Sequence, residues 1–178
     1  DAPSKVNLQA IESAIAKLAQ RWEDDCSTEL LRSFGEDRGL TLSNRFSNAF
    51  PSAYREHFSA QDGAEDAEIL AGLSNTKTLA VKLYRPIDAV PGVLRFKIFN
   101  TSKVALSDSL PVLERMGARV LDEHPFHIED GENNLWIHDL GLLLPETTRL
   151  SEVKDRFEEL YQQAWRGEVE SDDLNRLV

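Results

Sequence analysis

The chain has 178 residues, enough for one ordinary domain or for one small domain with a helical annex, and its 41% hydrophobic and 29% charged residues are typical of a soluble globular protein. Its 31 acidic and 20 basic residues give a formal net charge of -11. This balance argues against nucleic acid and against an anionic membrane surface as partners, because both attract clustered Lys and Arg.

Residues 4–34 are predicted to form one long helix. Apolar side chains recur there at alternating spacings of three and four residues. They are Leu8, Ile11, Ile15, Leu18 and Trp22. The helix should end near Gly35 or Gly39, where a left-handed backbone costs little. Because such a helix is longer than a small domain is wide, we expect its apolar stripe to contact another subunit, the second domain or a helical hairpin of its own chain.

Residues 40–75 predict shorter helices. Pro51 suits the first position of a segment that ends near Phe58, since proline has no backbone N–H to lose. Ser59, with Asp62 three residues later, resembles a cap for the next helical segment.

A change of period at residues 74–76 marks the expected domain boundary. The residues before it have the period of helices, whereas two runs after it, 79–84 and 94–99, alternate in side-chain type with a period of two. These runs predict an antiparallel hairpin across the proline-containing break between them. We therefore expect a helical segment, 1–75, followed by an α+β domain, 76–167.

The stretch from Leu106 to Phe126 is typical of a short helix that stops at a glycine and turns into a strand. Ser107 or Asp108 is the expected cap, and Pro111 is tolerated because it would lie in the first turn. Gly117 should end the helix. The stripe expected to be buried consists of Leu106, Leu110, Leu113 and Met116.

Two further strands and a helix complete the second domain. The strands should run from Arg119 to about Ile128 and from Leu135 to about Leu144, joined by a turn at Asp130-Gly131. The last helix spans about 150–166 and ends at Gly167. The order of elements predicts an α+β fold, a ferredoxin-like antiparallel sheet with helices on one face, preceded by the helical segment.

Both ends of the sequence suggest a segment of a larger protein. The chain starts at Asp1 rather than at Met, and Leu174, Leu177 and Val178 have helical spacing at the other end. We expect residues 168–178 to be the truncated start of a following element.

The sequence predicts no membrane-spanning helix, because no run of about 18 apolar residues is present. Cys26 is the only cysteine, which excludes an internal disulfide and a Cys-based zinc site and fits a reducing cytoplasm. Since Cys26 falls within a helical pattern, we expect a packed thiol rather than a nucleophile.

The sequence offers no cofactor motif. None of its nine glycines are two residues apart, so the G-x-G-x-x-G fingerprint of a nicotinamide site is absent and we expect no cofactor in this chain. His124, His127 and His138, with Glu123 and Asp139 beside them, suggest a metal site. Strand alternation should place His124 and His127 on opposite faces, so we expect ordinary surface or hydrogen-bonded histidines instead.

Catalytic groups are also not predicted. Asp108 and Glu114, or Glu123 and Asp139, could be called paired carboxylates, but acid–base work needs a cleft and a shifted pKa, and chance pairs are common in an acidic chain. A nucleophilic Ser107 or Ser109 would need a positioned base, which no motif supplies.

The turn from Asn100 to Lys103 is the best candidate for a binding site. It joins a strand to the start of a helix and offers backbone N–H groups, which attract anions such as the carboxylate of an amino acid. The candidate effector-binding residues are Asn100, Thr101, Ser102, Ser107 and Asp108. The alternative is a plain capped loop.

The chain resembles the N-terminal half of the very long bacterial NAD-specific glutamate dehydrogenases. Each matching block is modest alone, but their order and spacing are specific. The blocks are WEDDCSTELLRSFGEDRG (Trp22 to Gly39), RFSNAFPSAYREHFSAQDGAEDAEIL (Arg45 to Leu70), LRFKIFN (Leu94 to Asn100), LSDSLPVLERMGARVLDEHPF (Leu106 to Phe126), WIHDLGL (Trp136 to Leu142) and AWRGEVESDDLNRLV (Ala164 to Val178).

This resemblance implies a role that periodicity could not reveal. The family converts L-glutamate to 2-oxoglutarate and ammonia with NAD, on a core that lies further toward the C-terminus. Its earlier region holds ACT-like modules, which are ferredoxin-like folds, linked by helical segments. The resemblance therefore implies a non-catalytic regulatory or structural segment of a cytoplasmic oligomer, with the rest of the chain and other subunits as partners and an amino acid as an effector.

The sequence departs from the usual ACT pattern in three ways. An extra strand at Leu79 to Arg85 precedes the series, and the last strand is not evident after Gly167. The first strand–helix turn also lacks the glycine that often accompanies amino-acid binding, which favours an architectural role. The alternatives are a free-standing amino-acid-binding ACT-type sensor and a small metal- or carboxylate-dependent enzyme.

Overall fold

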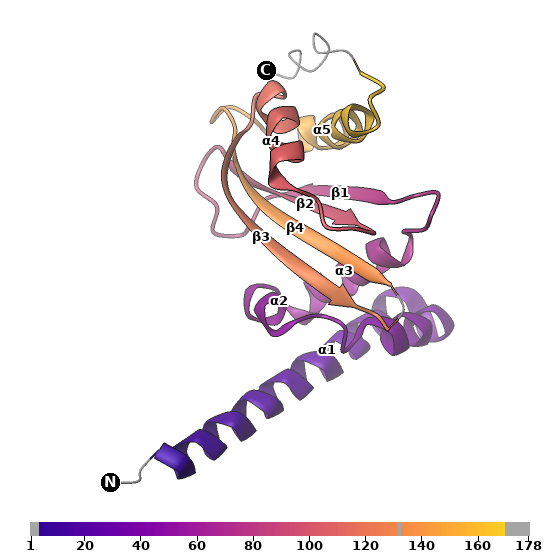
Figure 1. The fold of residues 1–178 in the computed structure, drawn as a ribbon, viewed down its shortest axis with the longest axis vertical. Coiled ribbons are helices and arrows are strands. Elements are labelled where there is room, and N and C mark those ends of the chain that lie inside the picture. Colours follow the sequence, from indigo (N-terminus) through magenta and orange to yellow (C-terminus); the bar gives the residue numbers. More distant parts are fainter. Residues whose placement is uncertain (1–3, 132, 170–178) are drawn as a thin grey trace. The chain divides into compact units, whose positions relative to one another are not determined.

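The computed structural model describes residues 4–131 and 133–169 (Figure 1). The chain forms two compact units. The first comprises the residues up to Ala71 together with Ile128–Asn133, and the second comprises Gly72–His127 and the chain from Asn134 onward. The prediction of a truncated element at residues 168–178, with its apolar positions at 174, 177 and 178, lies almost entirely outside the described residues.

Helix α1 (Ser4–Phe46) is interrupted at Gly35, whose φ of 78° and ψ of 177° are not helical. A positive φ is accessible to glycine at little cost, so the chain can break the helix here. The residues after the break form a second helical arm that folds back on the first. A hydrogen bond from Ser43 Oγ to Ser27 Oγ at 2.8 Å joins the two arms. Of the two predicted ends, Gly35 and Gly39, the helix breaks at Gly35.

Helices α2 (Ser52–His57) and α3 (Ala60–Ala71) follow. The predicted cap of α3 is confirmed, and it is reciprocal. Asp62 N donates to Ser59 Oγ at 3.1 Å, while Ser59 N donates to the Asp62 carboxylate at 2.9 Å. Two backbone N–H groups at the start of the helix thereby gain acceptors.

Aromatic side chains hold the helices of the first unit together. Trp22 meets Phe50 edge-on, with ring centroids 5.5 Å apart, and Phe50 stacks on Tyr54 at 4.5 Å. Trp22 Nε1 donates to the carbonyl of Phe58 at 3.0 Å. The apolar stripe of α1 is therefore partnered at Trp22, whereas its other members are 55–66% exposed; they are Leu8, Ile11, Ile15 and Leu18.

The second unit is built on a four-stranded sheet in the order β1-β2-β4-β3. The strands are β1 (Leu79–Tyr84), β2 (Val93–Asn100), β3 (Arg119–Glu129) and β4 (Asn134–Leu143). Strand β2 pairs antiparallel with β1 and with β4, so that Phe96 lies opposite Leu83 on one side and opposite Leu140 on the other. The predicted hairpin of β1 and β2 is confirmed.

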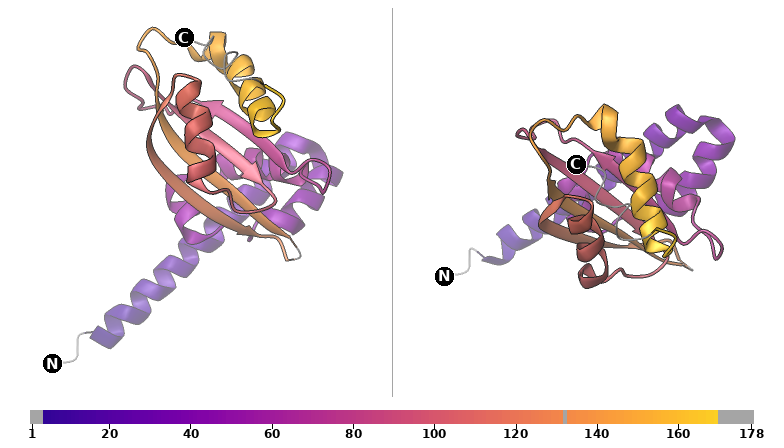
Figure 2. Two further views of the ribbon diagram at one scale, coloured as in Figure 1. Left: turned by 45° about the horizontal axis from the view of Figure 1, so that its top comes forward. Right: turned by 90° about the horizontal axis from the view of Figure 1, so that it is seen from above.

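Helices α4 (Leu106–Arg115) and α5 (Leu150–Trp165) cover one face of this sheet (Figure 2). Phe96 of β2 meets Phe157 and Tyr161 of α5 edge-on at 5.3 and 4.9 Å. Leu113 of α4 is fully buried in the same core. The α+β, ferredoxin-like class predicted from the order of elements is thereby confirmed.

The extra strand β1 has a clear place in this topology. In a β-α-β-β-α-β layer the last strand lies at the sheet edge beside the first, and here the first strand of that series is β2. Strand β1 occupies the edge beside β2 instead. Strand β1, which comes before the β-α-β-β-α-β series in the sequence, therefore takes the edge position that the last strand of the series usually has. That last strand is not evident in the described residues.

Two local predictions for α4 are wrong. Its N-cap is Ala105, which makes no side-chain cap hydrogen bond, whereas Ser107 or Asp108 was expected. Because the helix begins earlier than expected, Pro111 lies inside it rather than in its first turn. A proline there withholds one backbone hydrogen bond within the helix.

No helix among residues 4–131 and 133–169 combines the length and the apolar character needed to span a membrane.

Candidate functional site

The predicted effector residues lie on the loop between β2 and α4. Asn100 ends β2 with only 4% of its surface exposed. Its side-chain oxygen accepts hydrogen bonds from Ser102 N at 2.9 Å and from Ser102 Oγ at 3.2 Å. Thr101 N donates to the carbonyl of Thr78 at 3.1 Å, which extends the β1–β2 pairing by one step. The polar groups of this turn are therefore largely engaged with the turn itself and with β1.

A histidine on β4 holds the end of the same loop. His138 is 1% exposed, and its Nε2 accepts a hydrogen bond from Val104 N at 3.1 Å. Its other nitrogen, Nδ1, lies 2.8 Å from Glu123 Oε1 on β3. An Nε2 that accepts leaves the proton on Nδ1, which then donates to the carboxylate. This histidine is thus a structural bridge between two strands and the loop.

The remaining two predicted effector residues point elsewhere. Ser107 and Asp108 lie in the first turn of α4 and are exposed. Asp108 N already donates to the carbonyl of Ala105 at 3.0 Å. The structure therefore brings Asn100, Thr101 and Ser102 together in one turn and leaves Ser107 and Asp108 on the outer surface of α4. An effector role for the five residues stays a prediction.

The suspected carboxylate pair is separated by the sheet. Glu123 contacts His138, whereas Asp139, the next residue on β4, faces the other side and accepts from Arg95 Nε at 2.7 Å. Tyr84 OH donates to the second oxygen of Asp139 at 2.7 Å. Two carboxylates on opposite faces of a sheet cannot act on the same substrate, so Glu123 and Asp139 do not form a catalytic pair.

The histidines also divide between the two faces. His127 stacks on Trp136 at 4.7 Å, and Trp136 stacks on His138 at 6.1 Å, which places these rings on one face. His124 lies on the other face, 4.0 Å from Asp122. In the part of the chain that the structure describes, no three His, Cys, Asp or Glu residues form a group that could hold a metal ion.

Ser109 and Cys26 are packed rather than poised for reaction. Ser109 Oγ lies 3.0 Å from Tyr161 OH, and both residues are buried between α4 and α5. Burial raises the pKa of Tyr161 to about 12, so this phenol cannot serve as a base for the serine. Burial, with a smaller effect of Glu29, raises the pKa of the Cys26 thiol to about 12, which disfavours the reactive thiolate.

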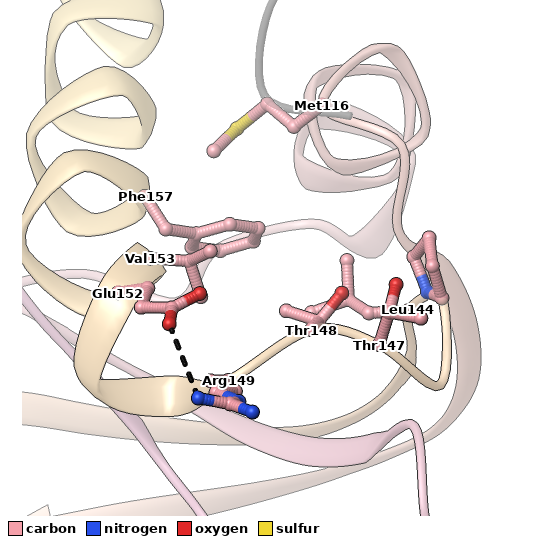
Figure 3. A pocket seen from close by; sticks show the side chains of 9 residues that line it. Met116, Leu144, Thr147, Thr148, Arg149, Glu152, Val153 and Phe157 are labelled. Carbon is pink, nitrogen blue, oxygen red and sulfur yellow. Dashed lines mark ion pairs between the residues drawn. The ribbon is translucent and has the colours of Figure 1, made fainter.

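The second unit has a hollow at the start of α5 (Figure 3). Its volume is about 210 Å³. Apolar side chains form its floor, and these are Met116 at the C-cap of α4, Leu144 directly after β4, and Val153 and Phe157 of α5. We call it the α5 hollow. The loop between β4 and α5 forms its polar rim.

The rim of the α5 hollow carries four polar side chains. Thr147, Thr148 and Arg149 come from the loop, and Glu152 comes from the first turn of α5. Arg149 Nη1 lies 3.7 Å from Glu152 Oε1 (Figure 3). Sequence reasoning missed this site. The run Thr-Thr-Arg before a predicted helix was the only local signal, and it did not indicate that residues at the ends of α4 and β4 would supply part of the floor.

Comparison with known proteins gives two adjacent family matches. The model described as "Glutamate dehydrogenase, helical motif 2" matches residues 29–73, and the model described as "Glutamate dehydrogenase, ACT3 domain" matches residues 78–154. The first match falls on the helices of the first unit. The second covers all four strands, α4 and the start of α5.

Three relatives align over nearly the whole chain. The NAD-specific glutamate dehydrogenase of Halomonas elongata is 34% identical over 99% of this chain, that of Pseudomonas aeruginosa 28% over 100%, and that of Mycobacterium tuberculosis 26% over 98%. In each case the chain spans only 11% of the relative's length.

Proposed function

The chain belongs to the family of large NAD-specific glutamate dehydrogenases, as a segment that covers helical motif 2 and the ACT3 domain, and from this premise we propose that it is a non-catalytic regulatory and structural part of such an enzyme. The observation that carries the proposal is the combination of matches. Both named regions fall in order along one chain that aligns almost completely with a small fraction of its relatives.

The strand-to-helix connections support a non-catalytic role, because they do not fit a dinucleotide. A nicotinamide site of the common type places a glycine-rich turn between a strand and a helix, so that the backbone can approach the pyrophosphate. The two strand-to-helix connections within the described residues of the second unit, Thr101–Ala105 and Leu144–Arg149, contain no glycine. We therefore expect NAD to bind another part of the parent enzyme.

The parent enzyme would oxidise L-glutamate to 2-oxoglutarate and ammonia with NAD, in the cytoplasm. Within it, this chain would contact the rest of the polypeptide and other subunits. The exposed stripe of α1 is the surface best suited to such a contact, because Leu8, Ile11, Ile15 and Leu18 each leave more than half of their surface in solvent.

The proposal includes a domain division and an effector role. We assign residues 1–75 to the helical segment and 76–167 to the ACT-like domain. An amino-acid effector at Asn100, Thr101, Ser102, Ser107 and Asp108 would have to open a turn whose hydrogen bonds are already made, so an architectural role for that loop is favoured.

A turnover assay tests the proposal directly. The 178-residue chain is mixed with L-glutamate and NAD, and formation of NADH is followed by absorbance, with the full-length enzyme of Halomonas elongata as the positive control. We expect no turnover from the chain under conditions in which the full-length enzyme is active. Turnover that copurifies with the chain would overturn the non-catalytic assignment.

A further inference from the structure

A neutral histidine closes the loop between β2 and α4. His138 Nε2 accepts a hydrogen bond from the backbone N–H of Val104 at 3.1 Å, and a backbone N–H can only donate. The single proton of the ring therefore lies on Nδ1, which donates to Glu123 Oε1 at 2.8 Å. The side chain of His138 is 2% exposed, and both of its nitrogens are engaged. A further proton must therefore enter at the nitrogen that the Val104 amide occupies.

The hydrogen bond to His138 ties this loop to the sheet. Of the backbone N–H groups in residues 103–107, all of which the structure describes, only that of Val104 donates to a residue of the sheet. Val104 is 5% exposed and belongs to the core, whereas its neighbours Lys103 and Ala105 are exposed. An exposed segment with one buried attachment opens locally at low cost in free energy once that attachment is lost.

Glu123 is the charged group that faces His138. In the part of the chain that the structure describes, α4 and α5 included, no other charged side chain makes a hydrogen bond or an ion pair with the ring. Ile98 of β2, which lies opposite His138 in the ladder, is apolar. Asp139 lies on the other face of the sheet, where Arg95 binds it. Because Glu123 already holds the Nδ1 proton, it directs a second proton to Nε2.

Two groups that carry or can gain positive charge lie beside Trp136, the ring that stacks on His138 at 6.1 Å. His127 of β3 stacks on Trp136 at 4.7 Å, and Lys103 Nζ lies 5.2 Å from the centre of the same ring. Both oppose a second positive charge on His138 while the loop is closed. Since Lys103 belongs to the loop, opening the loop moves this cation away from the ring.

We propose that the loop between β2 and α4 is an acid-sensitive hinge, which opens when His138 takes up a second ring proton. That proton sets an Nε2–H against the Val104 N–H, and two donors cannot bond to each other. The closed loop therefore excludes the proton, whereas the open loop exposes Nε2 to water and accepts it. A state that binds more protons gains population as the pH falls. Histidine is the side chain that ordinarily changes charge between about pH 5 and 8.

The hinge acts on the start of α4 and leaves the rest of the helix in place. Leu113 of α4 is fully buried in the core, and Ser109 Oγ lies 3.0 Å from Tyr161 OH of α5. The inference goes beyond the proposed non-catalytic role and does not depend on it. A chain whose hinge stays closed would still be a non-catalytic segment, and a chain with turnover could still have the hinge.

Amide hydrogen exchange of the 178-residue chain, followed by NMR, tests the hinge. The protection factor of the Val104 amide, corrected for intrinsic exchange, should fall by about ten- to a hundredfold between about pH 7.5 and about pH 5.5, because one proton changes an equilibrium by at most about tenfold per pH unit. The Thr101 amide, which donates to the carbonyl of Thr78, is the internal control and should keep its protection. A protection factor of Val104 that stays constant over this range would overturn the proposal.

The ring of His138 supplies a second measurement on the wild-type chain. Its ring nitrogen NMR signals report protonation directly, and their pH midpoint should coincide with that of the loss of protection at Val104. A Val104 transition with a different midpoint would assign the opening to another group and contradict the role of His138.

Two variants separate His138 from the other histidine beside Trp136. His138→Gln can still accept from the Val104 N–H but takes up no proton, so the protection of Val104 should no longer depend on pH. The matched control, His127→Gln, should leave the transition in place. Persistence of the transition in His138→Gln, or its loss in His127→Gln, would show that another group controls the loop. If His138→Gln does not fold, the two wild-type measurements still decide.

Discussion

The carboxylate of Glu158 on α5 accepts a hydrogen bond from the backbone N–H of Leu83 on β1 at 2.8 Å. Lys154, one helical turn before Glu158, donates from Nζ to the carbonyl of Leu83 at 3.0 Å and also forms an ion pair with Glu158. Strand β1 lies at the edge of the sheet, where unpaired backbone groups invite pairing with another chain. Two side chains of α5 thus satisfy part of that edge.

Replacing Glu158 should loosen the edge of the sheet. Glu158→Ala removes a charge-assisted hydrogen bond from a side chain that is 19% exposed, so we expect a loss of about 1–3 kcal/mol in the free energy of unfolding. Urea denaturation measures this loss, and faster hydrogen exchange at the Leu83 amide would locate it. The control is Glu159→Ala, the neighbouring exposed glutamate. Equal stability of the two variants would contradict the role of Glu158.

Truncating Leu113 should reveal the packing of α4 on the sheet. This side chain is fully buried in the core that α4 and α5 share with the strands, so Leu113→Ala should cost about 2–5 kcal/mol in the free energy of unfolding. Leu121→Ala on β3, where the side chain is 49% exposed, should cost far less. A neutral urea transition for Leu113→Ala would refute the packing.

Removing His138 should release the loop before α4. His138→Ala leaves Val104 N without its acceptor and Glu123 without its donor, so we expect a loss of about 1–3 kcal/mol and faster exchange of the Val104 amide. His124→Ala, on the other face of the sheet, is the control. The bridge would be disproved if the Val104 amide exchanged at the same rate in both variants.

Asp122 should make stability depend on acid pH. The Arg95 guanidinium, which donates to Asp122 at 2.8 Å, is the main cause that lowers the pKa of this carboxyl, while burial opposes it. A carboxyl whose pKa is lowered by folding stabilises the folded state at pH values above its unfolded pKa of about 3.9. This contribution is lost as the pH falls through the pKa of the folded state.

We therefore expect wild-type stability to fall more steeply below about pH 4 than that of Asp122→Asn, measured as urea midpoints across the acid range. Asp155→Asn removes one charge from the exposed surface of α5 and serves as the matched control. Identical acid slopes for the wild type and Asp122→Asn would show that the Arg95 contact is too screened to matter.

The exposed stripe of α1 should promote association. We expect the 178-residue chain to self-associate in light scattering, and the double change Ile15→Glu and Leu18→Glu to lower its average mass, because both positions are more than half exposed. Leu40→Glu changes a residue that is 46% exposed outside the stripe and should have no such effect. A wild-type chain that stays monomeric at high concentration would count against this surface.

Local signals predicted most elements well. The reciprocal cap of Ser59 and Asp62 and the break at Gly35 depend on a few neighbouring residues, and the structure has both. The predicted start of α4 was too late in the sequence, because a residue of another strand holds the loop before this helix. Val104 is held by His138, which lies 34 residues further along the chain, so no pattern near Ser107 could show it.

By itself, the sequence determined which segments of the chain are helical and which are extended, because these properties follow from short-range periodicity. Only the tertiary structure decided that β1 completes the edge beside β2, that Glu123 and Asp139 lie on opposite faces, and that a rim and a floor meet at the start of α5. These depend on register and packing between distant segments, where each pairing gains free energy only after the others have formed.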